Sequence, residues 1–236
     1  MRKLQLHLVL GSGASLSALV EPLLAHAAFV ARHPGSTYKV AVRDTMTAFF
    51  PLPPGRPEFD ATVEIGLPRA AADDVLIDQV AELAPAIGPS INKGLSAAVI
   101  GHEEIVNPDV GPFQLFWCMR RLPHLTHEQY LRYWLASHSE FGRYQPGRPG
   151  ARQLHADLPA SAKAAQAAGV EVDDFDGVAQ VYFGGAALFP DSRPSEAFDA
   201  ATQADGALIS DTPRGVGGLH RIIATIESPL VLPQRF

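Results

Sequence analysis

The segment Tyr130-Leu131-Arg132-Tyr133-Trp134-Leu135-Ala136-Ser137-His138 places a titratable imidazole within an apolar helical stripe. Trp134 and His138 are four residues apart, so a helix would present them on one face. Leu131 and Phe141 extend that face at spacings of three. The pattern predicts a partly buried helix whose histidine either secures the helix or takes part in chemistry.

Outside this segment, apolar and alternating patterns predict the same order of elements twice along the chain. A strand, a helix, two strands, a second helix and a final strand are expected in residues 4–106 and again in residues 114–226. Residues 107–112 contain two prolines and a glycine and would link the halves. The expected strands are residues 4–10, 38–49, 61–67, 93–106, 114–120, 151–156, 177–183 and 219–226, and the expected helices are residues 15–31, 72–86, 126–143 and 195–208, with an inserted helix or loop at residues 159–169.

This order predicts an α+β fold built from two βαββαβ units, residues 1–107 and residues 112–236. An antiparallel sheet that carries two helices on one face leaves its other face bare, and we expect that face to be apolar. A second sheet of the same kind is its natural cover. The two sheets would therefore close against each other within one chain.

The composition is that of a folded protein that binds neither nucleic acid nor membranes. Hydrophobic residues make up 47% of the chain and charged residues 19%, and the formal net charge is -6. Nucleic acids and anionic membranes both attract basic proteins, so neither partner is expected. No apolar run approaches the roughly 20 residues of a membrane span, and a cytoplasmic location is the default expectation. The single cysteine, Cys118, lies in an apolar run and is expected to be a buried thiol.

Several segments of the second half carry a resemblance to a known family. They are Phe116-Trp117-Cys118-Met119-Arg120-Arg121, Leu125-Thr126-His127-Glu128-Gln129-Tyr130, Tyr133-Trp134-Leu135-Ala136-Ser137-His138, Asp176-Gly177-Val178-Ala179-Gln180-Val181-Tyr182-Phe183 and residues 205–211. They resemble the first strand, the capped helix with its Tyr-Trp-x-x-x-His signature, the third strand and the late helix of the EthD family. The resemblance covers about residues 112–230.

The resemblance implies ferredoxin-like units whose two sheets form an intramolecular, pseudo-dimeric α+β barrel. The first half has His26 but no Trp-x-x-x-His pattern, so we interpret it as a diverged copy in a fused tandem repeat with one functional half. Families with this barrel include small-molecule cyclases, dehydratases, isomerases and some oxygenases that use neither metal nor organic cofactor. A small-molecule substrate and no cofactor are therefore expected. An exposed apolar rim would permit a homodimer of the fused barrel.

Three residues are the catalytic candidates. His138 in an apolar pocket would be a neutral base near physiological pH, or it would simply bind a backbone carbonyl. Strand alternation places His155 on the face opposite Leu154, where it would meet His138 across the pocket or lie at the surface. Tyr182 would donate a proton or fill the core with its hydroxyl satisfied.

The candidates for substrate binding are mostly aromatic. His220 would line either the pocket or the core between the sheets, and Arg120 would neutralise an anion near the pocket mouth or form a surface ion pair. The full set is Phe116, Tyr130, Trp134, Phe141, His220 and Arg120. No metal ligands are expected, because cysteine clusters and His-Glu-x-x-His are absent from the sequence.

Three functions remain open at this point. The first is a cofactor-independent enzyme that acts on a small apolar or aromatic metabolite by general acid and base chemistry, as a lyase, dehydratase, isomerase or cyclase. The second is a cofactor-free oxygenase of quinols or phenols, in which a histidine deprotonates the substrate. The third is an accessory protein that binds a small molecule without turning it over.

Overall fold

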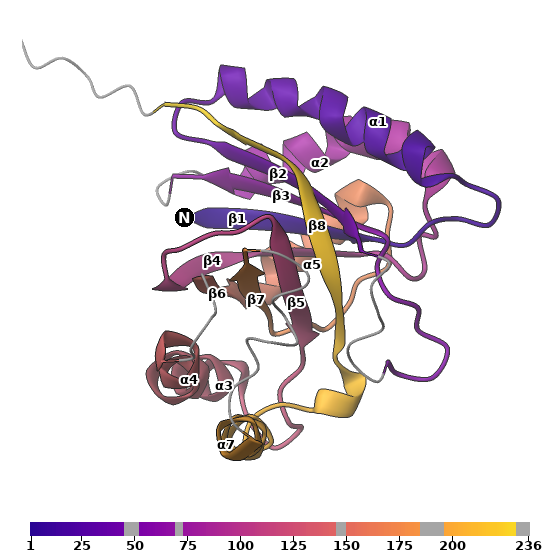
Figure 1. Ribbon diagram of the computed structural model, residues 1–236. Coiled ribbons are helices and arrows are strands. Elements are labelled where there is room, and N and C mark those ends of the chain that lie inside the picture. Colours follow the sequence, from indigo (N-terminus) through magenta and orange to yellow (C-terminus); the bar gives the residue numbers. More distant parts are fainter. Residues whose placement is uncertain (45–51, 69–72, 145–149, 185–195, 230–236) are drawn as a thin grey trace, which may run out of the picture.

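The computed structural model describes residues 1–44, 52–68, 73–144, 150–184 and 196–229. Within these ranges, eight antiparallel strands form one closed barrel in the order β1-β3-β2-β8-β5-β7-β6-β4 (Figure 1). The strands are β1 (Arg2–Leu8), β2 (Thr37–Arg43), β3 (Ala61–Leu67), β4 (Ala97–Asn107), β5 (Phe113–Met119), β6 (Gly150–Ala156), β7 (Gly177–Phe183) and β8 (Val216–Glu227).

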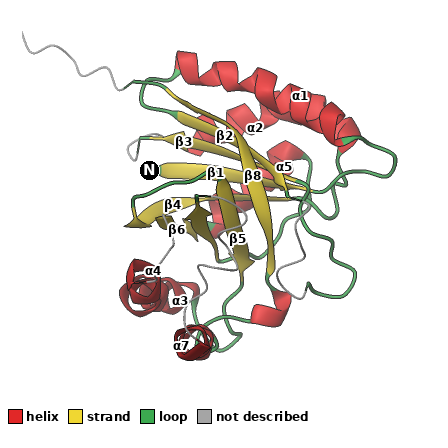
Figure 2. Cartoon of the chain, in the orientation of Figure 1, coloured by secondary structure: helices red, strands yellow, loops and turns green. Residues whose placement is uncertain are grey.

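The helices lie outside the barrel, with α1 and α2 on one side and α3, α4 and α7 on another (Figure 2). The longer helices are α1 (Leu16–His26), α2 (Asp73–Ile87), α3 (His127–Tyr133), α4 (Ser139–Tyr144), α5 (Leu158–Ala168) and α7 (Glu196–Gly206). Short helical turns are η1 (Ala27–Arg32), η2 (Gly88–Ser90), η3 (Trp134–His138) and η4 (Thr212–Arg214). In the part of the chain that the structure describes, no helix is both long and apolar enough to cross a membrane.

Both halves of the chain arrange their strands in the same way. The first four strands lie in the order β4-β1-β3-β2, and the last four lie in the order β8-β5-β7-β6. The halves join where β2 pairs with β8 and where β4 pairs with β6. These pairings confirm the expected α+β barrel, closed within one chain. The domain division at residues 107–112, and the origin of the halves as a repeat, stay predictions.

Most expected elements are present, with ends that differ by a few residues. The strands at residues 61–67 and 177–183 match at both ends, and residues 159–169 form α5 rather than a loop. The last strand begins at Val216, three residues before its expected start. The end of the expected strand at residues 45–49, and the expected helix starts at residues 72 and 195, lie outside the described residues.

The helix expected at residues 126–143 is interrupted. It begins as expected, because the Thr126 hydroxyl accepts from the Gln129 amide and the Gln129 side chain accepts from the Thr126 amide. The turn Trp134–His138, however, is a π-helix. A π turn contains more residues than an α turn, so it changes which side chains share a face. Trp134 is 1% exposed, whereas the side chain of His138 is 23% exposed.

Alternation along β1 shows why the barrel interior differs from expectation. Leu4, Leu6 and Leu8 point outward into the main apolar core, which also includes residues of α1, α2 and α5. Lys3 and His7 occupy the alternate positions and point into the barrel, and every residue of this strand is buried. The expectation of an apolar inner face is therefore wrong at this end of the barrel. The inward side chains at this end of the barrel are polar because they satisfy one another across the lumen.

The opposite end of the barrel is filled by apolar side chains. Phe116 contacts His7 and Phe59 there, and Cys118 is fully buried in the same cluster, as expected. The buried members of this cluster are Val9, Phe59, Ala97, Val99, Phe116, Cys118, Leu154, Ala156, Phe175, Val178 and Val216. The barrel is thus closed by packing at one end, which leaves the polar end as the open one.

Candidate active site

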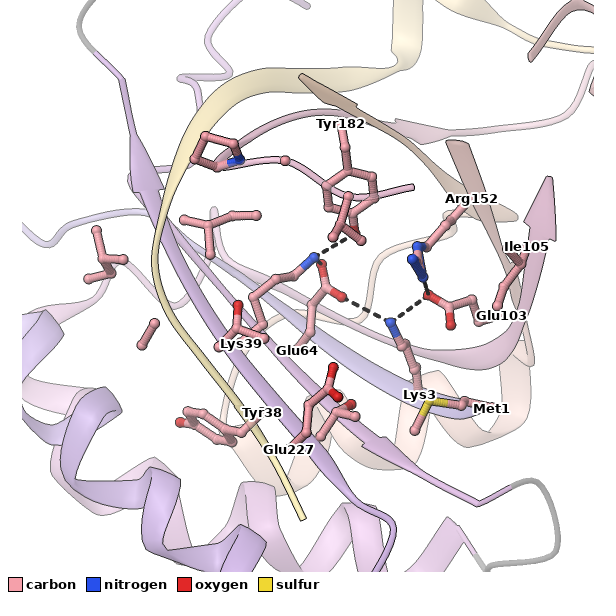
Figure 3. Close-up of a pocket in the computed structure, with 18 residues that line it drawn as sticks. Met1, Lys3, Tyr38, Lys39, Glu64, Glu103, Ile105, Arg152, Tyr182 and Glu227 are labelled. Atoms are coloured by element: carbon pink, nitrogen blue, oxygen red, sulfur yellow. Dashed lines mark hydrogen bonds and ion pairs between the residues drawn. The ribbon is translucent and has the colours of Figure 1, made fainter. Parts of the chain in front are cut away.

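A cavity of about 520 Å³ opens at the polar end of the barrel (Figure 3). Its outer wall is largely apolar and includes Ile105, Val110 and Ile222. Its inner wall carries charged and hydroxyl side chains from six strands: Lys3, Lys39, Glu64, Glu103, Arg152 and Tyr182. An apolar mouth above a charged floor is the usual form of a small-molecule site.

Lys39, on β2, is at the centre of this floor. Its Nζ lies 2.6 Å from each of three oxygens, those of Glu64, Gln114 and Tyr182. An ammonium has three protons, so these contacts use all of them. Burial lowers the pKa of Lys39, and the charge of Glu64 opposes that effect. The lysine is consequently held in one position, with its donors directed at fixed acceptors.

Glu64, on β3, is the buried anion that holds the floor together. Besides Lys39, it accepts from Lys3 Nζ at 3.3 Å, from Gln114 Nε2 at 3.1 Å and from Gln180 Nε2. Burial alone would raise the pKa of Glu64, but the ammonium groups of Lys39 and Lys3 outweigh it and bring the pKa to about 2. Glu64 is therefore ionised at any physiological pH and is too weak a base to take a proton from substrate.

Tyr182, on β7, brings a hydroxyl group into the same floor. Burial raises its pKa, and the charge of Glu64 raises it further, so the phenol keeps its proton. Because Lys39 donates to the Tyr182 oxygen, the phenol proton is left to point elsewhere. The described residues provide no recorded acceptor for it. Tyr182 can thus donate to an oxygen atom in the cavity, while Lys39 stabilises negative charge on the phenol oxygen.

Two buried histidines lie deeper in the lumen. Burial lowers the pKa of His7 to about 4 and that of His220 to about 3, so both are neutral at physiological pH. His220 is hydrogen-bonded to Phe59 O at 2.9 Å and lies 3.3 Å from Thr62 Oγ1. Neither ring nitrogen of His7 has a hydrogen-bond partner among the described residues. Buried polar atoms of this kind favour a polar species in the lumen beside them.

The sequence-predicted residues fall into separate places. Tyr182 lines the lumen cavity, and Phe116 and His220 lie deeper in the barrel with their rings 4.7 Å apart. His220 therefore belongs to the core between the sheets, one of the two positions expected for it. Arg120 lies at the far end of β5, where it pairs with Asp173 and Asp174 and covers the Phe175 ring. This position is at the opposite end of the barrel from the cavity.

His138 is the last residue of η3. It lies outside the barrel and faces the late helix α7. Its Nδ1 is 2.7 Å from Asp205 Oδ2, and the hydroxyl of Tyr133 donates to the other oxygen of Asp205 at 2.7 Å. His138, Phe141 and Trp134 line a cavity of only about 80 Å³. That volume holds two or three water molecules, at about 30 Å³ each. The partner of His138 is thus a carboxylate rather than the backbone carbonyl considered above.

His155 lies on the outer face of β6, against the turn Trp134–His138. Its ring stacks on Trp134 at 5.1 Å, and its Nε2 is 2.9 Å from Gln153 Oε1. It lines a groove of about 420 Å³ that does not include His138. The structure therefore does not bring the two histidines together across one pocket. Tyr130 is fully buried, with its ring 5.6 Å from that of Trp134. It packs in the apolar layer between the helices and the outside of the barrel.

Sequence reasoning missed most of the charged floor. Lys3, Lys39, Glu64, Glu103 and Arg152 were not among the candidates. Lys3, Lys39 and Glu64 occupy inward positions on strands whose outward positions are apolar, whereas the strands of Glu103 and Arg152 carry polar residues on both faces. The signal was the alternation of charged and apolar residues in strands that are buried on both faces, which a solvent-exposed sheet face would produce as well.

Comparison with known proteins supports the fold and the family. The family model for the EthD domain matches residues 122–213. This part of the chain is similar to the EthD domain family. It includes α3, η3 and α4 with the Trp134–His138 signature, together with β6, β7 and α7. A search of curated protein sequences finds no match to the chain.

Solved structures with the same fold span both halves of the chain. An anthrone oxidase-like protein has a TM-score of 0.61 and 11% identity, and the alignment covers 100% of this chain and 96% of that protein. A candidate monooxygenase from Lactobacillus acidophilus has a TM-score of 0.56 and 7% identity, with 98% and 97% covered. A protein described as chlorite dismutase-like has a TM-score of 0.53 and 12% identity, with 94% of each chain covered. These likenesses concern the fold alone, and they extend over both halves of the α+β barrel.

Proposed function

We propose that this chain is a small-molecule enzyme that transfers protons within the barrel lumen, without a metal or organic cofactor. The observation that carries the proposal is the contact between Lys39 and Tyr182 at the floor of the 520 Å³ cavity. Tyr182 donates its proton to an oxygen of the bound substrate while a water molecule or buffer base in the open cavity takes the carbon-bound proton, and the Lys39 ammonium stabilises the phenolate that forms. The apolar wall holds a small apolar or aromatic body. Isomerase, lyase, dehydratase and cyclase reactions all contain such a step.

Exchange of carbon-bound protons tests this proposal without knowledge of the natural product. Aromatic ketones such as 2-tetralone, anthrone and phenylpyruvate would be incubated with the protein in deuterated buffer and followed by NMR. We expect the protein to accelerate deuterium incorporation next to the carbonyl for at least one of them, because Tyr182 stabilises the enol oxygen. The proposal would be contradicted if the wild-type protein and the Tyr182→Phe variant gave equal exchange rates for every ketone.

Lys39 is assigned a positioning role, and its substitution gives a separate prediction. Lys39→Met removes the donor to the Tyr182 oxygen, so we expect exchange to slow about 10- to 100-fold, the value of one charge-assisted hydrogen bond. Lys39→Arg keeps a cation at this position and is expected to recover part of the rate. The pH dependence of exchange would be measured for both variants. Equal losses in the two variants would argue that Lys39 serves packing alone.

A second candidate is a cofactor-free oxygenase, favoured by the names of the anthrone oxidase-like and monooxygenase structural neighbours. The same floor would stabilise the deprotonated form of an electron-rich phenol or quinol, which then reacts with molecular oxygen. Oxygen consumption in the presence of anthrone or a panel of quinols would separate this function from simple isomerisation. Exchange without oxygen uptake favours the first candidate, and uptake that depends on Tyr182 favours the second.

A further inference from the structure

Arg152, on β6, carries donors that the protein does not use. Its guanidinium carbon lies 5.3 Å from the centre of the Tyr182 ring, within the wall of the lumen cavity. One terminal nitrogen, Nη2, donates to Pro108 O at 3.1 Å. The Nε atom is buried and has no hydrogen-bond partner among the described residues. A buried N–H of a charged group without an acceptor is costly, so a bound acceptor at this point is favoured.

The charges of the floor do not balance. Lys3 Nζ lies 2.5 Å from Glu103 Oε1, and Lys39 is paired with Glu64. Glu103 Oε1 lies 3.7 Å from Arg152 Nη1, which is beyond hydrogen-bond distance. Glu103 is therefore paired mainly with Lys3. Three cations thus share two carboxylates, which leaves one positive charge. Glu227 also lines the cavity, but it is exposed at the end of β8, where solvent screens its charge.

The position of the surplus charge defines what would fit there. The arginine side chain is 13% exposed, so its charge acts in a region that is partly desolvated. A guanidinium is planar and matches the two oxygens of a carboxylate better than it matches a single neutral acceptor. Tyr182 lies beside it and provides a separate donor. Two donors close together suit a ligand with an acidic group and a second oxygen nearby.

We propose that the cavity takes small apolar or aromatic carboxylic acids as monoanions, and that Arg152 selects them. The ligand carboxylate pairs with the Arg152 guanidinium, its neighbouring oxygen accepts from Tyr182, and its apolar body lies against Ile105 and Ile222. This inference deepens the proposed function, because it names the substrate class of the same site. It concerns binding alone, so it can hold or fail independently of proton transfer.

Paired ligands provide the test. Salicylate, 3-hydroxy-2-naphthoate and phenylpyruvate would each be compared with the corresponding neutral amide by calorimetric or NMR titration at pH 7. We expect at least one acid to bind more tightly than its amide, by about 10- to 100-fold. Arg152→Met should abolish that difference. Arg132→Met is the matched control, because Arg132 is an exposed partner of Glu128 on α3.

The outcomes separate the inference from its alternatives. Arg152→Lys keeps the charge, so it should retain part of the preference for acids, and it covers the case in which Arg152→Met fails to fold. The inference is overturned if no acid binds more tightly than its amide, or if the preference survives Arg152→Met. Preferential acid binding without any exchange activity would sink the proposed function but not the binding assignment. Exchange activity on neutral ketones, without any preference for acids, would sink the binding assignment but not the proposed function.

Discussion

Tyr182→Phe should slow proton exchange about 10²- to 10⁴-fold, which is the usual contribution of a general acid. The substitution removes only the hydroxyl that points into the lumen and leaves the ring under Arg152. Lys39 loses one of its three acceptors, so the free energy of unfolding should fall by about 1–3 kcal/mol, and the variant should still fold. Exchange kinetics and thermal unfolding would be measured on the same preparation.

A control separates lost chemistry from lost structure. Tyr133→Phe removes a tyrosine hydroxyl bound to Asp205 outside the barrel, at a site that does not contact the lumen. It should cost less stability, because this hydroxyl is near solvent, and it should leave the exchange rate within about twofold of the wild type. If the two tyrosine variants lose activity in proportion to their stability, Tyr182 has no role as an acid.

Glu64→Gln should lower the free energy of unfolding by about 3–5 kcal/mol, because it leaves Lys3 and Lys39 buried with too little negative charge. For a chain of this length that corresponds to a fall in Tm of about 10 °C. Chemical denaturation and calorimetry would measure it. Glu128→Gln, which breaks an exposed pair with Arg132, should change stability by less than about 1 kcal/mol.

The effect of Glu64→Gln should also depend on pH in one direction. The pKa of Glu64 is depressed to about 2 in the folded protein, against about 4.3 in an unfolded chain. The stability that its charge provides is therefore fully present above about pH 5 and is lost as the pH falls toward 2. The wild type and the variant should converge over that interval. A constant difference from pH 7 to pH 2 would show that the carboxylate charge is not what matters.

The sequence carried enough information for the barrel, because its signals are local and repeated. Leu4, Leu6 and Leu8 alternate as an outward-facing strand should, and the same order of elements recurs in both halves. The capping box at Thr126 fixed the start of α3. The π turn that follows could not be anticipated, since nothing in local spacing distinguishes it from an α turn.

The candidate site was harder to predict, because it depends on closure of the barrel. Lys3 and Glu64 are far apart in sequence and meet only when β1 pairs with β3 inside the lumen. In the sequence alone, such charged positions are typical of a sheet face that is exposed to solvent. Tyr182 was a candidate because its hydroxyl could donate a proton or orient a ligand, with a core position as the open alternative. His138 stood out for its motif, but the cavity that it lines has a volume of only about 80 Å³.

Whether chemistry occurs in the lumen or under the outer helix is decided by one comparison. The exchange rate of His138→Ala would be measured beside that of Tyr182→Phe, with the same ketone, protein concentration and temperature. A lumen site predicts that His138→Ala keeps about half of the wild-type rate or more, while Tyr182→Phe falls to about 1% or less. Loss of exchange in His138→Ala, with the wild-type rate retained in Tyr182→Phe, would contradict a lumen site and return the chemistry to the Trp134–His138 turn.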